Sequence, residues 1–225
     1  MSLYHVRKDE MLRYLGYAGQ CIPEHLDAQV DDIISQCETS SKPAFVYRMF
    51  PIDDTQGDIR LVGSSLILPG NDIYNHLKGA SQVALMACTL GLANEIMLKR
   101  IQAKSATDAL MYGAAGSSLV ESVADVAEAE IVAEGAKMGL HTNWRYSPGY
   151  GDLPLSVQDE FVRTLDAQRS LGITVTPSNL LIPSKSVTAI IGLFSAPQEH
   201  TKRSCKGCAI FDYCSLRKAG APCWR

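Results

Sequence analysis

Apolar residues recur at helical spacing in the first part of the chain. They stand at Ile22, Leu26, Val30, Ile33 and Ile34, which together mark one apolar face of a helix. This spacing predicts a helix over 23–37 with a proline in its first turn and two adjacent aspartates facing solvent. By similar reasoning we expect helices over 73–78, 92–103 and 105–139, and another that Ser156 caps and that ends near 171–172.

Shorter runs rich in β-branched and aromatic residues predict strands. Two of these runs, 44–50 and 61–68, flank a polar turn and predict a hairpin. Further strands are expected at 82–90, 179–182 and 187–194, the last two completing the sheet. Strands and helices are mixed here without regular β-α-β alternation. The pattern therefore predicts an α+β fold: a largely antiparallel sheet with flanking helices and one long central helix.

The segment 105–139 is long and only weakly polar. Acidic residues recur through it so that no window of about 18 residues lacks one, which excludes a membrane span. Small residues at 113–118 would let another backbone approach closely, as suits a helix at the centre of a fold. Glu121 lies on this helix with Asp125 and Glu128 one and two turns away. This pattern fits a solvated helix face as well as a carboxylate that faces a ligand.

Composition and charge narrow the class of protein. The chain has 225 residues, of which 46% are hydrophobic and 20% charged, so it has ample material for a core. Its formal net charge of −3 argues against a nonspecific binder of nucleic acid or of an anionic membrane. The N-terminal residues lack the apolar run of a secretory signal, and we therefore expect a cytoplasmic protein.

The loop at 143–154 carries the main candidate chemistry. It presents Arg145 and Tyr150 beside Pro148, which restricts φ, and beside Gly149 and Gly151, which tolerate positive φ. A guanidinium offers a planar fork of donors matched to a carboxylate. The loop therefore fits a ligand site, and equally an ordinary connection whose aromatic side chains cover the core.

These residues resemble a known family. The run Arg145-x-x-Pro148-Gly149-Tyr150, followed by a helix, a Leu-Gly-Ile segment and Ile-Pro-x-x-Ser-Val, is similar to the reactivation (activation) domain of cobalamin-dependent methionine synthase. The matching family segments have the form R-P-x-P-G-Y-P and W-P-x-x-S-V. The resemblance covers about 9–194 and is strongest from 109 onward. The sequence departs from the family pattern at Tyr146 and Gly151, where the family has proline.

The resemblance implies a fold, a ligand and a partner. It implies that residues 1–195 form a methionine synthase activation-domain-like unit that binds S-adenosylmethionine. Arg145 would pair with the carboxylate of this ligand, Glu121 would take its amino group, and Tyr150 would pack near the cofactor edge. The implied partner is a methionine synthase core or another corrinoid protein that carries cobalamin, with a reductant protein supplying the electron.

The tail at 196–225 is a separate chemical feature that the family resemblance does not cover. It holds Cys205, Cys208, Cys214 and Cys223, and clustered cysteines in a cytoplasmic chain more often bind metal than form disulfides. The four thiols fit a structural zinc site or a [4Fe–4S] cluster, and free or disulfide-forming cysteines are a third alternative. A cluster in the tail could deliver the electron locally.

The other three cysteines, Cys21, Cys37 and Cys88, lie on apolar runs and are expected in the core.

The sequence therefore predicts an accessory role in methyl transfer. We expect the chain to reactivate a corrinoid methyltransferase such as methionine synthase by holding S-adenosylmethionine over cobalamin during reductive methylation. The alternative from another class is a non-catalytic docking module for a corrinoid protein, with a zinc-stabilised tail. A methyltransferase acting on a small molecule is a weaker interpretation, because the Gly-rich loop of dinucleotide-like folds is missing. The histidines are scattered and suggest no catalytic triad.

Overall fold

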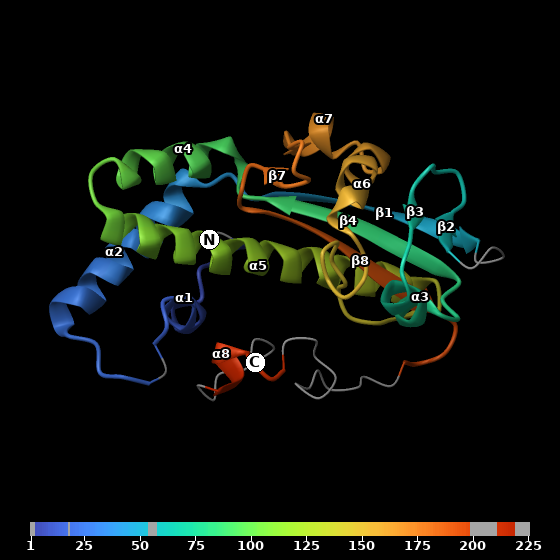
Figure 1. The fold of residues 1–225 in the computed structure, drawn as a ribbon, viewed down its shortest axis with the longest axis horizontal. Helices are drawn as coiled ribbons and strands as arrows, with labels where there is room; N and C mark the ends of the chain where they lie inside the picture. Colours follow the sequence, from blue (N-terminus) through green and yellow to red (C-terminus); the bar gives the residue numbers. More distant parts are fainter. Residues whose placement is uncertain (1–2, 18, 54–57, 199–210, 219–225) are drawn as a thin grey trace.

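A six-stranded antiparallel sheet forms the middle layer of the fold (Figure 1). The computed structural model describes residues 3–17, 19–53, 58–198 and 211–218. The strands of the main sheet are β1 (Ala44–Asp53), β2 (Ile59–Leu61), β3 (Ile67–Leu68), β4 (Gln82–Thr89), β5 (His141–Thr142) and β8 (Ser186–Phe194). Their order is β3-β2-β1-β4-β8-β5. The predicted α+β class and antiparallel sheet are confirmed.

Helices cover both faces of this sheet. One face packs against α1 (Lys8–Tyr14), α2 (Glu24–Ser40), α4 (Gly91–Gln102) and α5 (Ala106–Lys137). The other packs against α3 (Asn71–Leu77), the 3-10 turn η1 (Leu155–Val157), α6 (Gln158–Thr164) and α7 (Ala167–Leu171). In β4, Met86 faces the first layer and Leu85 the second, so the strand is buried on both sides and reads as a continuous apolar run.

The long helix α5 runs along the sheet as the predicted central helix (Figure 1). Its N-terminus is capped by Ser105, whose side chain accepts a hydrogen bond from the Asp108 amide at 3.2 Å. Small residues let the sheet approach closely. A Cβ added at Gly135 would lie 3.1 Å from Leu193 Cδ2. No helix in the described part of the chain is long and apolar enough to cross a membrane.

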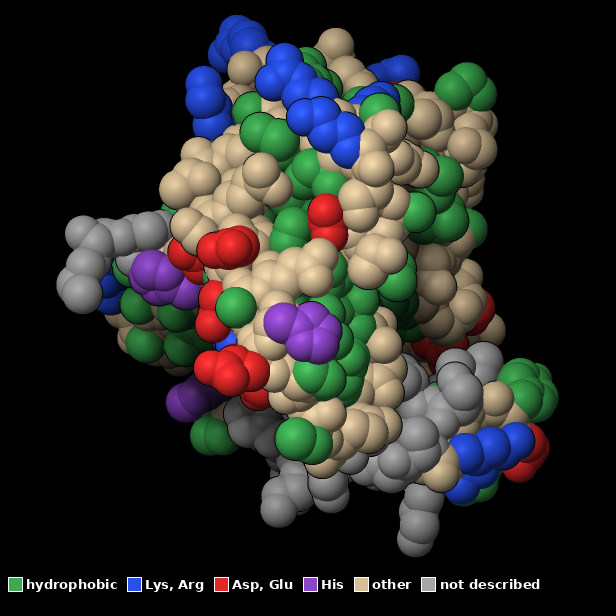
Figure 2. Space-filling view, turned by 90° about the vertical axis from the view of Figure 1, so that its left-hand side faces the viewer, with side chains coloured by type: hydrophobic (Ala, Val, Ile, Leu, Met, Phe, Trp, Pro, Cys, Tyr) green, Lys and Arg blue, Asp and Glu red, His purple; other side chains and the backbone are tan. Residues whose placement is uncertain are grey.

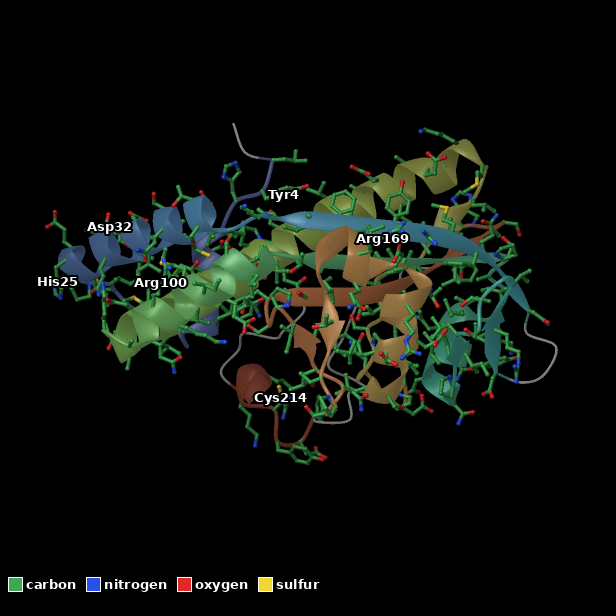
Figure 3. All side chains as sticks on the ribbon, turned by 90° about the horizontal axis from the view of Figure 1, so that it is seen from above. Tyr4, His25, Asp32, Arg100, Arg169 and Cys214 are labelled. Atoms are coloured by element: carbon green, nitrogen blue, oxygen red, sulfur yellow. The ribbon has the colours of Figure 1, made fainter. Side chains whose placement is uncertain are left out.

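The end of the molecule formed by α2 and α4 is highly charged. Figure 2 shows Lys and Arg side chains gathered at the top of this end, above Asp and Glu side chains. Asp31 and Asp32 are exposed on α2, as predicted, and Figure 3 shows Asp32 on the outer side of this helix. The last turn of α4 carries Lys99 and Arg100, where the helix dipole favours cations.

Several predicted elements differ in detail. The hairpin is present, with Ile52 paired to Leu61, but the run 61–68 holds the end of β2 and all of β3 instead of one strand. Gly63, with a φ of +81°, lies in the turn between these two strands and breaks the run. The predicted strand at 179–182 shortens to β7 (Leu181–Ile182), which pairs with β6 (Thr174–Val175) in a separate two-stranded sheet. The prediction that it completes the main sheet was therefore wrong.

The helix after the candidate loop was also predicted with the wrong bounds. Ser156 does not cap it but lies inside η1, and α6 begins at Gln158 without a side-chain cap. The helix then breaks at Asp166, which adopts a left-handed φ of 54°, and α7 follows as a separate short helix. Local sequence pattern did not reveal this break, because Asp is one of the few non-glycine residues that tolerate this conformation.

Candidate functional site

Backbone hydrogen bonds to β8 hold the candidate loop in place. Tyr146 forms an isolated antiparallel bridge with Ile190, with N–O distances of 2.9 and 2.8 Å. The buried amide of Asn143 donates from Nδ2 to the carbonyl of His76 at 2.8 Å and accepts from the Gly192 amide at 2.7 Å. The start of the loop is thus an extension of the sheet, and its side chains have defined directions.

The glycines of the loop make its tight turn. Gly149 and Gly151 adopt φ values of 91° and 51°, as their residue type predicts. The Gly149 amide donates to the Leu153 carbonyl at 2.8 Å, which closes the turn. A Cβ at Gly151 would collide with side-chain oxygens of Asp72 and Tyr146. Only glycine fits at 151, where the compared family has proline.

The ring of His76 from α3 packs against aromatic side chains of the loop. The ring of His76 lies 4.7 Å from that of Trp144 and 5.0 Å from that of Tyr146, between centroids. His76 Nε2 is 3.0 Å from the Trp144 carbonyl oxygen. The Tyr146 hydroxyl donates to the carbonyl of Tyr150, a residue that is itself 58% exposed. Sequence reasoning missed this role of His76 because the contact joins α3 to a loop far along the chain.

Arg145 extends from the loop onto three carboxylates of α5. Its Nη2 lies 3.2 Å from Glu121 Oε2 and 2.8 Å from Asp125 Oδ1, and its Nη1 lies 3.4 Å from Glu128 Oε2. The guanidinium side chain is only 17% exposed. Arg145 and Glu121 therefore converge, as expected. Asp125 and Glu128 were seen only as helix neighbours of Glu121, although their spacing already placed them on its face.

Burial and charge shift the pKa values of this cluster. Burial is the largest effect on Glu121 and raises its pKa, Asp125 and Glu10 add to the rise, and Arg145 opposes it. For Arg145, burial is again the largest single effect and lowers the pKa. The nearby carboxylates, led by Glu128, together outweigh burial, so the net shift is upward. The shift therefore favours the charged form of Arg145, whereas it disfavours the charged form of Glu121.

A cleft of about 250 Å³ opens beside this ion cluster. Among the predicted site residues, Glu121, Arg145, Pro148 and Tyr150 line it, and Gly149 shapes the turn without lining the cleft. The remaining lining residues come from the loop, α6, β7 and β8, and they are Ser147, Gln158, Leu181, Ser186, Val187 and Thr188.

Two polar residues of the cleft lie between α6 and β8 and are almost fully buried. Thr188 Oγ1 donates to Gln158 Oε1 at 2.9 Å. Sequence reasoning placed Gln158 in the first turn of a helix, where it was not distinguishable from a solvated residue. Its contact with Thr188 depends on how α6 crosses the sheet. This hydrogen-bonded pair is thus a buried polar part of the cleft lining.

The predicted metal ligands lie mostly outside the described residues. Cys205, Cys208 and Cys223 fall there, and Cys214 is partly buried just before the short helix α8 (Ser215–Lys218). Within the ranges that the structure describes, no group of three or more His, Cys, Asp or Glu side chains could hold a metal ion. The tail site therefore stays a prediction.

Two of the remaining cysteines behave as predicted. Cys37 and Cys88 are buried in the core, and burial raises the pKa of the Cys88 thiol to about 12. Cys21, however, is exposed, so its prediction as a core residue was wrong. It lies before the first residue of α2, outside the apolar face of that helix.

Comparison with known proteins supports the fold. No protein-family model matches the chain, and no curated protein matches it in sequence. Among solved structures, the chain is similar to a crystal structure of the MetH reactivation domain bound to AdoHcy, with a TM-score of 0.64. The match covers 96% of this chain and 81% of that one, at 16% sequence identity. The resemblance inferred from the loop motif is confirmed for the fold, which is what an identity this low shows.

Proposed function

We propose that this chain binds S-adenosylmethionine in the cleft beside Arg145 and Glu121, and that it reactivates a cobalamin-dependent methyltransferase such as methionine synthase. The observation that carries the proposal is the convergence of these two side chains on one cleft. The relative with the same fold was crystallised with AdoHcy, the demethylated form of this ligand.

The charge of the cleft matches the proposed ligand. S-adenosylmethionine carries an ammonium, a sulfonium and a carboxylate, so its net charge is +1. Three carboxylates of α5 surround Arg145 beside the cleft, and one of them, Asp125, also pairs with Arg7 at 3.2 Å. These carboxylates outnumber the two guanidiniums that pair with them, which leaves the cluster with a net negative charge. A cationic ligand is therefore attracted, and its positive groups would offset the cost of the buried charge on Glu121.

Each residue then has a defined task. The zwitterion of the ligand would separate the Arg145–Glu121 pair, with its carboxylate on Arg145 and its ammonium on Glu121. One ion pair is thus replaced by two of the same kind. Pro148 and Gly149 set the shape of the turn, and the exposed ring of Tyr150 offers an apolar face at the mouth of the cleft, next to the cofactor edge.

The proposed methyl transfer requires the protein mainly to position the two reactants. S-adenosylmethionine would supply an electrophilic methyl group, and cobalamin on the partner would receive it. This transfer requires no side-chain nucleophile and no general base. The partner would be a methionine synthase core or another corrinoid protein. The electron would come from a reductant protein or from a [4Fe–4S] cluster in the tail. A zinc site there would only stabilise the tail.

Calorimetry with S-adenosylmethionine tests the proposal. We expect the wild type to bind and Arg145→Met to weaken binding by about 10-fold to 100-fold, which corresponds to the roughly 1.5–3 kcal/mol of one charge-assisted hydrogen bond. Glu121→Gln is a second variant that keeps the shape of the side chain. Arg163→Met is the matched control, because Arg163 also pairs with two acids but is 67% exposed and lies outside the cleft.

The outcome separates the two classes of function. An absence of binding heat in the wild type would contradict the proposal and favour a docking module without a ligand. Equal losses in Arg145→Met and Arg163→Met would mean that the cleft is not the binding site.

A further inference from the structure

A second and larger groove lies along α5, on the side of the cleft toward the N-terminus of this helix. Its volume is about 590 Å³, which is within the range of roughly 300–1,000 Å³ typical of small-molecule sites. Figure 1 shows α5 between α4 on one side and α1 on the other. Residues of these three helices line the groove together with Lys185.

The floor of the groove is apolar and open. It follows one face of α5 from Ala106 to Ser117, a span of about 17 Å at 1.5 Å per residue. Gly113 lies in the middle of this floor, and a Cβ added there would meet nothing within 4 Å. Leu15, which directly follows α1, and Leu98 of α4 contribute apolar walls. An elongated apolar chain could therefore lie along the helix.

Lys185 places a cation at one end of this apolar surface. Its methylene carbons cross Gly116, where an added Cβ would lie 3.4 Å from Lys185 Cγ and Cε. Its ammonium donates to Ser117 Oγ at 2.8 Å, and Ser117 Oγ itself donates to the Gly113 carbonyl at 3.1 Å. The contact of the ammonium with Ser117 involves only one of its three donor hydrogens.

No acidic residue of the described ranges forms an ion pair with Lys185, in contrast to Arg145, whose partner Glu121 lies one turn of α5 beyond Ser117. Burial lowers the pKa of Lys185, because the ammonium has lost water without gaining a countercharge. A ligand anion would supply that countercharge.

We propose that this groove binds an amphiphilic monocarboxylate, whose carboxylate pairs with Lys185 and whose saturated chain lies along the small-residue face of α5. The site is separate from the cleft of the proposed S-adenosylmethionine site, since Lys185 and Ser117 do not line that cleft. The proposal does not depend on the function proposed above.

Calorimetry with the full chain and a series of hexanoate, octanoate and decanoate tests the site. We expect the affinity to rise by about twofold to fourfold for each methylene buried in the groove. Decanol and decylamine are the matched ligands without a negative charge, and both should bind at least about tenfold more weakly than decanoate. Equal binding of decanoate and decanol would overturn the role of Lys185, and no binding of decanoate would overturn the site.

Two variants locate the binding. Lys185→Met keeps the length of the side chain, removes its charge, and should abolish the preference for decanoate over decanol. Gly113→Leu should fill the groove and remove binding of both ligands. It should not lower the melting temperature, because it replaces a helical glycine at a position with open space. Unchanged decanoate affinity in either folded variant would refute the proposal, and Lys185→Met decides the question if Gly113→Leu fails to fold.

Discussion

The cation at 145 holds three carboxylates together, so its removal should destabilise the fold in a pH-dependent way. In Arg145→Met the side-chain volume is nearly kept, but Glu121, Asp125 and Glu128 lose the guanidinium that lies 2.8–3.4 Å from them. Breaking a buried ion pair costs about 3–5 kcal/mol. These carboxylates are 29–45% exposed and remain partly hydrated, so we expect about 2–3 kcal/mol at neutral pH.

The sign of the pH dependence follows from Glu121. Its folded-state pKa is already raised above the ordinary value of 4.5, so the folded protein binds this proton more tightly than the unfolded chain does. The stability linked to this group is therefore fully present below its unfolded pKa and is lost as pH rises through its folded pKa. Arg145 lowers the pKa of Glu121, so its removal raises this pKa further and widens the pH range between the unfolded and folded pKa values. The destabilisation by Arg145→Met should shrink as pH falls toward the unfolded-state pKa of Glu121, because this carboxylate then takes up a proton.

Urea unfolding of wild type and Arg145→Met at pH 7 and pH 4 measures both effects. The matched control is Arg163→Met, whose exposed ion pairs on α6 should contribute less than about 0.5 kcal/mol at either pH. Adding Glu121→Gln to Arg145→Met should restore part of the loss, because it removes one of the repelling charges. An Arg145→Met protein as stable as the control, or equally destabilised at both pH values, would refute the reasoning.

Three further predictions concern the loop and the tail. Gly151→Ala should cost about 3 kcal/mol, because it combines a left-handed φ with a steric clash, whereas Gly139→Ala, with a similar φ and open space, should cost about 1 kcal/mol in the same urea unfolding. Asn143→Ala should cost about 3 kcal/mol of unfolding free energy, since it leaves the buried Gly192 amide and the partly buried His76 carbonyl without this partner, and a loss as small as that of an exposed substitution would contradict this role. The purified chain should contain iron or zinc by elemental analysis, and Cys214→Ser should lower that content, whereas a metal-free wild type would exclude both predicted tail sites.

The local pattern predicted those elements whose periodicity or turn chemistry is strong. Long helices such as α2 and α5, and strands such as β1, β4 and β8, were found with ends displaced by a few residues. The loop glycines adopt the positive φ values that their type suggested. Where the local sequence signal was weak, the predicted elements were wrong. The break at Asp166 and the two-strand β2–β3 segment depend on single backbone positions that composition does not reveal.

The sequence by itself determined the class of the fold, the central helix, and which side chains carry charge near the loop. It determined these because helical spacing, strand patterning and glycine conformations are local properties of the chain. Only the tertiary structure decided that Arg145 faces three carboxylates at once, that His76 supports the loop, and that Lys185 lies in an apolar groove without a countercharge among the described residues. These contacts join segments far apart in the chain, and their geometry depends on how the helices and loops pack around the sheet.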